Sequence, residues 1–96
     1  MIRLNRYRDG ALHVSFKGLT LSVNTIVSRV LPPRHFTVKN WSENEDLAKA
    51  ALESGAFIVS DVEIPTGHVN APIWEITADH PAWMEFEAAE KLRNAS

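Results

Sequence analysis

Apolar and polar residues alternate along the first 27 residues in a pattern that predicts a three-stranded antiparallel meander. A two-residue turn at Lys17-Gly18 would align apolar side chains on one face, pairing Phe16 with Leu19, Val14 with Leu21 and Leu12 with Val23. A three-residue loop, Arg8-Asp9-Gly10, with its glycine in the left-handed conformation, extends that face by pairing Leu4 with Val14 and Ile2 with Phe16. The opposite face would be polar and would carry Arg3, Asn5, Tyr7, His13, Ser15, Thr20, Ser22 and Asn24. We expect the apolar face, with Phe16 and Leu19 both buried, to pack on the rest of the chain, and the polar face to meet water or a partner.

The alternation ends at Thr25-Ile26-Val27, where we expect a bulge or a change of direction. Pro32-Pro33 then predicts an extended, unpaired connector between the two halves of the chain. Phe36 and Val38 alternate as a short strand inside this connector. The chain is thus expected to be one domain, 1–96, made of a basic β-meander (1–28), a Pro-Pro connector (29–40) and an acidic α-β-β-α part (41–96).

A capping box predicts the first α-helix, over about residues 43–54. Ser42 would be the N-cap residue, and Glu45 follows it three positions later, as this motif requires. Gly55 supplies a left-handed residue at the C-terminal end of the helix. The expected buried stripe consists of Leu47, Ala48, Ala51 and Leu52.

Two strands and a second helix complete the predicted α+β fold. Phe57-Ile58-Val59, with Val62 and Ile64, predicts one strand or two short ones, followed by a turn at Pro65-Thr66-Gly67. The run 73–77 predicts the next strand, and Pro72 just before it favours an edge position or a strand start. The last helix is expected to open around Asp79-His80-Pro81, to end near Arg93, and to bury Ala82, Trp83, Phe86 and Ala89.

Composition excludes several classes of site. The 96 residues are 45% hydrophobic and 23% charged, as in ordinary globular domains, and they include no cysteine. Disulfides, thiolate zinc sites and cysteine nucleophiles are therefore excluded. Apolar runs reach four residues at most and Met1-Ile2-Arg3-Leu4 starts no signal peptide, so we expect a soluble, cytoplasmic protein without a membrane partner.

Charge is segregated along the chain. Residues 1–39 carry seven basic side chains and one acid, whereas residues 40–96 carry three basic side chains and eleven acids. Such halves either fold against one another or bind partners, and the second option suits head-to-tail assembly of identical copies or a larger protein assembly.

The basic half supplies a candidate interaction surface. Its members are Arg3, Arg6, Tyr7, Arg8, His13, Arg29, Arg34, Lys39 and Trp41. Cations beside an aromatic side chain are typical of nucleic-acid contact. Because the whole chain is acidic, with an isoelectric point near 6.0, an ordinary solvated or subunit-facing sheet is favoured over nucleic-acid binding.

No motif indicates catalysis, a cofactor or a metal. The four histidines lack ligand spacing, and Glu43/Glu45 and Glu85/Glu87 are two residues apart, so the members of each pair do not face each other on a helix. The chain has no nucleophile elbow and no glycine-rich phosphate loop. We therefore expect no enzyme; the best residues for one would be His68 and His80 with Asp79, because the histidines titrate near neutral pH.

Two segments, residues 46–59 and 64–73, resemble short modules of small phage and prophage proteins, in which a helix ends at glycine, a strand follows and a Pro-x-Gly turn leads to a second strand. The resemblance implies a phage-encoded accessory protein. The favoured hypothesis is a non-enzymatic structural protein at a head, neck or tail interface of the virion. The alternative is an inhibitor that binds a host or defence protein, possibly through its acidic face.

Overall fold

In the computed structural model, a run of three strands precedes the part of the chain that contains the two α-helices. The model describes residues 1–25, 28–66 and 69–95. The elements are β1 (Ile2–Arg6), β2 (Leu12–Phe16), β3 (Leu19–Thr20), the 3-10 helix η1 (Ser28–Val30), β4 (His35–Thr37), the 3-10 helix η2 (Ser42–Asn44), α1 (Glu45–Glu53), β5 (Phe57–Pro65), β6 (Asn70–Ile76) and α2 (Pro81–Ala95).

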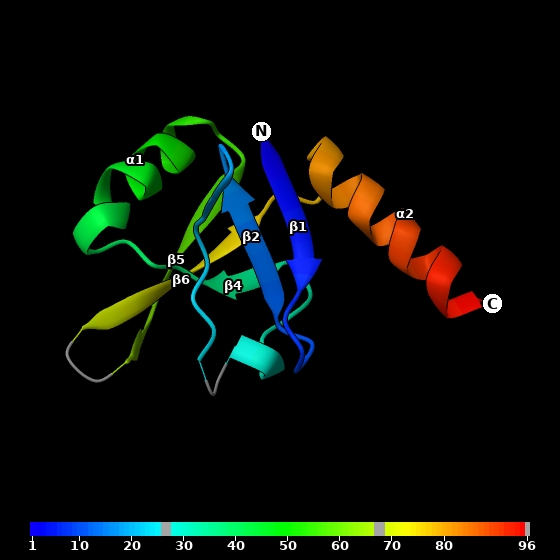
Figure 1. Cartoon of the computed structure of the whole chain (residues 1–96), viewed down its shortest axis with the longest axis horizontal. Helices are drawn as coiled ribbons and strands as arrows, with labels where there is room; N and C mark the ends of the chain where they lie inside the picture. Colours follow the sequence, from blue (N-terminus) through cyan, green and yellow to red (C-terminus); the bar gives the residue numbers. More distant parts are fainter. Residues whose placement is uncertain (26–27, 67–68, 96) are drawn as a thin grey trace.

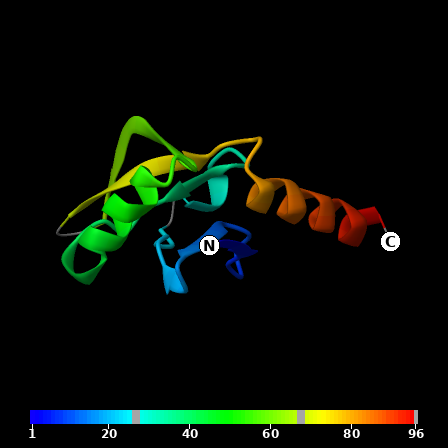
Figure 2. The same ribbon diagram turned by 90° about the horizontal axis from the view of Figure 1, so that it is seen from above.

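The strands form two antiparallel sheets that lie against each other (Figures 1 and 2). The meander sheet has the strand order β1-β2-β3, and the second sheet has the order β4-β6-β5. Helix α1 lies at one end of this pair of sheets, and α2 starts at the other end and extends beyond it (Figure 2). The predicted fold class, a three-stranded meander followed by α-β-β-α in one small domain, is confirmed.

A single apolar cluster joins both sheets and both helices. Phe36 of β4 meets Phe57 and Trp74 edge to face, with ring centroids 5.5 and 6.4 Å apart. The other members come from β2, β6, α1, α2 and the segments between elements: Leu12, Val14, Phe16, Leu21, Val38, Leu47, Ala48, Ala51, Ala56, Ile76 and Trp83. The elements therefore share one core, as a chain of this length needs if it is to fold alone.

The register of the meander is confirmed around both turns. Leu4 pairs with Val14, and Phe16 pairs with both Ile2 and Leu19. Lys17 and Gly18 have φ values of 54° and 81°, which makes their turn the type I′ turn that suits the twist of a hairpin. The other loop contains the three expected residues, because the Tyr7 N–H donates to the Ala11 carbonyl and Gly10 has a φ of 91°.

The third strand is shorter than predicted. The backbone N–H groups of Leu21 and Ser22 both donate to the Val14 carbonyl, so a bulge ends the pairing after Thr20. The chain then pairs with the segment after β4, where Ser22 lies opposite Val38. The predicted pairing of Leu12 with Val23 is therefore wrong, and the alternation breaks before Thr25. Ile26 and Val27 lie outside the described residues.

The bulge and the edge position of β3 also change which side chains are buried. Ser22 was expected on the polar face but is only 3% exposed, because the chain turns inward after the bulge. Leu19 is 59% exposed instead of buried. It belongs to the edge strand, so Phe16 lies on one side of it and solvent on the other.

The Pro-Pro segment is a turn, not an extended connector. The His35 N–H donates to the Pro32 carbonyl at 2.9 Å, and β4 follows directly and pairs with β6. Because Val38 also bridges to Ser22, residues 29–40 join the two sheets.

The predicted capping box is wrong. Ser42 has a φ of 54° and begins η2, whereas an N-cap residue has extended backbone. Helix α1 starts at Glu45 after Asn44, whose side-chain Nδ2 donates to the Thr20 carbonyl at 2.8 Å instead of capping the helix. The C-terminal end is as expected, with Gly55 at a φ of 79°. Leu52, expected on the buried stripe, is 38% exposed.

The second sheet places β6 at its centre. Strand β5 is one strand with an irregularity between Val59 and Glu63. Pro72 is the third residue of the central strand β6, so both the expected edge position and the expected strand start are wrong. The proline is tolerated for two reasons. On the β5 side it lies opposite Glu63, at the irregularity. On the β4 side it lies just beyond the end of the strand, where its carbonyl accepts a hydrogen bond from the Val38 N–H. The predicted turn runs into Gly67, which lies outside the described residues.

Helix α2 contacts the body through the part of the helix that runs as far as Glu90. Trp83 is buried and Phe86 is half-buried, as predicted. Ala89, expected on the same buried stripe, is exposed, whereas the next residue, Glu90, still binds Arg6 of β1. Beyond Glu90 the helix extends away from the body (Figures 1 and 2).

Candidate interaction surfaces

The candidate basic surface is divided by ion pairs within the chain. Arg6 binds Glu90 through two hydrogen bonds, Nε to Oε2 at 2.9 Å and Nη2 to Oε1 at 2.8 Å. Its guanidinium carbon also lies 5.2 Å from the centre of the Phe86 ring. These hydrogen bonds raise the pKa of Arg6 and lower the pKa of the Glu90 carboxyl. Arg6 therefore fastens α2 to β1 and is not available for a partner.

Two more basic side chains of the first half bind acids of the second half. Arg34 pairs with Glu75, and its Nη1 donates to the Ile76 carbonyl at 3.1 Å. Lys39 Nζ lies 2.6 Å from Glu43 Oε1, and this hydrogen bond lowers the pKa of the Glu43 carboxyl. The segregated charges are thus partly paired inside the molecule.

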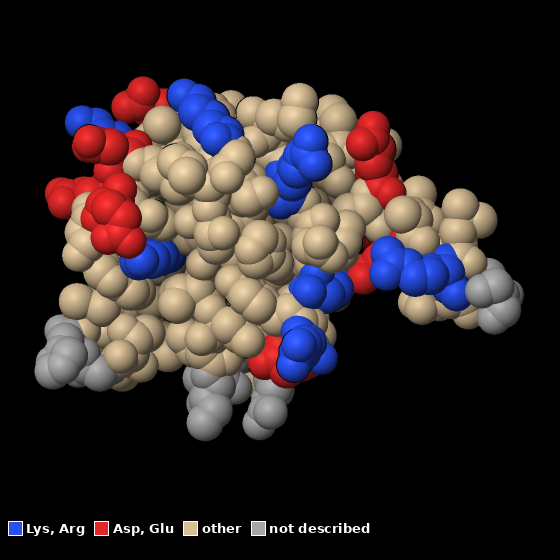
Figure 3. Space-filling view, viewed as in Figure 1, with Lys and Arg blue, Asp and Glu red and all other residues tan. Residues whose placement is uncertain are grey.

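The remaining members of the predicted surface occupy different parts of the molecule. Arg3, Tyr7 and His13 share the outer face of the meander sheet, where the Tyr7 and His13 rings meet edge to face at 5.1 Å. Arg8 is exposed in the following loop and Trp41 is half-buried before η2. The side chain of Arg29 lies outside the described residues. Over β1 and β2 the surface carries little charge (Figure 3), so this face lacks the dense positive charge typical of nucleic-acid binding.

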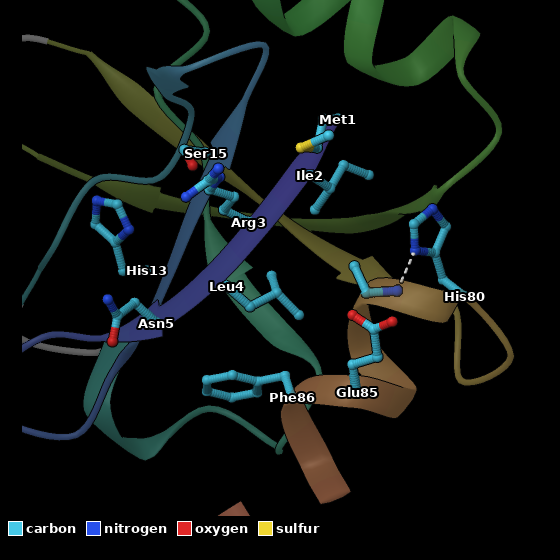
Figure 4. A pocket seen from close by; sticks show the side chains of 11 residues that line it. Met1, Ile2, Arg3, Leu4, Asn5, His13, Ser15, His80, Glu85 and Phe86 are labelled. Carbon is cyan, nitrogen blue, oxygen red and sulfur yellow. Dashed lines mark hydrogen bonds between the residues drawn. The ribbon is translucent and has the colours of Figure 1, made fainter. Parts of the chain in front are cut away.

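A groove of about 790 Å³ lies between β1 and the start of α2 (Figure 4). Ile2, Leu4 and Phe86 supply its apolar part, and polar side chains, among them Arg3 and Glu85, surround it. His80 also lines the groove, and its Nδ1 accepts the Ala82 N–H at 3.1 Å in the first turn of α2. Charged and polar side chains thus surround the apolar part of the groove. A groove of this kind can hold a peptide segment.

The outer edge of β1 borders this groove. The Met1 carbonyl and the Tyr7 N–H bond toward β2. Because backbone groups alternate in direction along a strand, those of Ile2 and Leu4 point away from β2, toward α2. A strand edge of this kind can pair with an extended chain.

Helix α2 carries a second apolar stripe that the sequence analysis missed. Met84 and Leu92 are 57% and 76% exposed, and Ala88 between them is exposed as well. The spacing of four residues places the three side chains on one side of the helix, opposite Trp83 and Phe86. Their i, i+4, i+8 spacing is visible in the sequence. The stripe that contains Trp83 and Phe86 is, however, the stronger signal for the buried side of the helix.

Strand β5 also exposes large apolar side chains. Ile58, Val59 and Val62 are each 51–55% exposed on this edge strand. The irregularity after Val59 and the acids Asp61 and Glu63 interrupt the edge, as natural proteins do to prevent strand pairing.

The remaining titratable groups form no metal site within the described ranges: no three His, Asp or Glu side chains there could hold an ion. His68 lies outside those ranges. Acidic side chains gather over η2 and the start of α1, where Glu43, Glu45 and Asp46 are exposed (Figure 3).

The chain matches no family model, and no match was found among curated proteins or solved structures. None of the helices in the described part of the chain is long and apolar enough to cross a membrane.

Proposed function

We propose that this protein is a non-enzymatic assembly protein, a component of a phage particle at a head, neck or tail interface, that acts by binding other protein chains. The observation that carries this proposal is the uncovered outer face of α2. Exposed apolar stripes of this kind are typical of protein–protein contact sites.

The physical reason is that the distal part of α2 has little support from the body. Trp83 is the last buried side chain in the part of the helix whose side chains are described, and residues 91–94 are exposed. A helix without tertiary packing is marginal in water, since most helical stability in proteins comes from packing of an apolar face. A partner chain on Met84, Ala88 and Leu92 would supply that packing.

Two preparations test the proposal. Particles purified from the encoding phage or lysogen are analysed for the chain by quantitative mass spectrometry, and tagged protein is used to recover partners from a lysate of uninfected host. We expect the chain in the particles at a fixed copy number. Absence from the particles, together with one stoichiometric host partner, would overturn the proposal and support the host-directed inhibitor instead.

The double variant Met84→Glu/Leu92→Glu tests the surface within the same experiment. We expect the double variant to be lost from the particles. The control variant Thr20→Glu, at an exposed position of β3, should remain in them. Retention of the double variant would show that the outer face of α2 does not carry the function.

A further inference from the structure

We propose that the outer face of α2 is a self-association surface, on which α2 of a second copy packs in antiparallel orientation. This inference rests on the proposed assembly function and names the partner. The contact would be isologous, with the same helix face used by both copies around a two-fold axis.

The apolar stripe is self-complementary about its centre. With the two-fold axis at Ala88, Met84 of one copy lies against the partner's Leu92, and the reverse contact repeats on the other side. Ala88 would face the partner's Ala88, and these small side chains let the two helices approach closely. Met84 and Leu92 are the most exposed large apolar side chains of the described part of α2, so they have the most area to bury.

Charge selects the antiparallel orientation. Glu85 and Glu87 precede the centre of the stripe, and Lys91 and Arg93 follow it. Glu87 and Lys91 lie on the same flank, with Oε1 and Nζ 3.9 Å apart in one helix. In an antiparallel pair Glu87 approaches the partner's Lys91, whereas a parallel pair would place like charges side by side.

The proposed contact leaves the intramolecular packing of α2 unchanged. The opposite side of the helix holds Trp83 in the core, Phe86 under Arg6, and Glu90 in its bidentate ion pair. Substitutions on the outer face therefore test association without removing a contact to the body.

The test is sedimentation equilibrium of the full chain between about 1 and 200 µM. We expect a monomer–dimer equilibrium with a Kd on the order of 10 µM, as befits a small interface. Leu92→Glu should weaken the dimer at least about tenfold while the thermal midpoint at low protein concentration changes by less than about 3 °C. Ile58→Glu, on the exposed edge strand β5, is the matched control and should leave the dimer intact.

A charge exchange tests the orientation. Glu87→Lys and Lys91→Glu should each weaken the dimer, because each places like charges together across the two-fold axis. The double variant E87K/K91E restores opposite charges and should restore the dimer.

Three outcomes would overturn the inference: a monomer at about 200 µM, a dimer that survives Leu92→Glu but not Ile58→Glu, or a dimer that the charge exchange does not restore. A monomer that is nevertheless present in phage particles would refute self-association and leave the proposed function standing. A dimer of the expected kind that is absent from particles would refute the virion role alone.

Discussion

Ser22 shows how one side chain can hold the meander together. Its Oγ accepts the Val14 N–H at 3.0 Å and lies 3.0 Å from the Tyr7 hydroxyl, in a buried position at the bulge. Ser22→Ala leaves the Val14 N–H without this acceptor, so we expect a loss of about 1–2 kcal/mol in the free energy of unfolding. Thr20→Ala, at an exposed site two residues earlier, should cost less than about 0.5 kcal/mol. Urea denaturation of both variants checks this, and equal costs would contradict the assigned hydrogen bonds.

The Arg6–Glu90 pair predicts a pH dependence. The pKa of Glu90 is lower in the folded chain than its ordinary value of 4.5, chiefly because of the hydrogen bond from Arg6. A lowered carboxyl pKa stabilises the fold above the unfolded value, and this stabilisation is lost as pH falls through the folded pKa.

Glu90→Gln isolates this effect. Because the side chains of Arg6 and Glu90 are 32% and 25% exposed, we expect the wild type to exceed the variant in free energy of unfolding by no more than about 1 kcal/mol at pH 7. The difference should shrink as pH is lowered below about 4.5. Urea titrations at several pH values measure it, and a difference that grows toward acid pH would contradict the assigned ion pair.

At the scale of elements, the Lys17-Gly18 turn connects two apolar residues, Phe16 and Leu19, that the alternating pattern predicts to be equally buried. Phe16 is 5% exposed and belongs to the core, whereas its cross-strand neighbour Leu19 is 59% exposed. We expect Phe16→Ala to cost about 3 kcal/mol or more, as large core truncations do. Leu19→Ala should cost less than about 1 kcal/mol because little apolar area is lost from the interior. Chemical denaturation compares the two, and a larger cost at Leu19 would refute the observed edge position.

The start of α1 gives a prediction that separates the observed structure from the expected capping box. Ser42 has left-handed backbone, which costs a residue with a Cβ about 1–2 kcal/mol relative to glycine. Glycine loses roughly 0.5–1 kcal/mol more backbone entropy on folding, so Ser42→Gly should stabilise the protein by about 0.5 kcal/mol. A capping serine would make the same change destabilising. The thermal midpoint of the variant distinguishes the two.

Local patterns predicted the elements better than their ends and edges. The turn at Lys17-Gly18, the loop at Gly10 and the helix end at Gly55 follow from glycine chemistry within a few residues, and the structure has them as expected. The bulge after Thr20 and the central position of β6 depend on which segments meet in space. After Leu21, whose N–H still bonds to β2, the chain pairs with the segment after β4, and no periodicity within residues 19–24 encodes that partner.

At the scale of the molecule, the segregated charges are partly paired within the chain, but the side chains that form these pairs could not be identified from sequence. Arg6, Arg34 and Lys39 each bind an acid of the other half. Two of these partners, Glu90 and Glu75, are distant in sequence, so only the tertiary fold reveals the pairs. The second stripe of α2 was missed for a related reason: two apolar sides of one helix compete, and packing decides which side is covered.

The last prediction concerns what holds copies of the molecule together. Head-to-tail contact between the basic and acidic halves would depend on exposed charges, which are screened beyond about 3 Å at 1 M salt. The α2 pairing depends mainly on burial of Met84 and Leu92, and salt does not screen that contribution. We therefore expect the dimer Kd to rise less than about tenfold between 0.05 and 1 M NaCl, because only the Glu87–Lys91 contacts are weakened. Sedimentation equilibrium at both concentrations measures this. Complete dissociation at 1 M NaCl would mean that the segregated charges, and not the outer face of α2, join the copies.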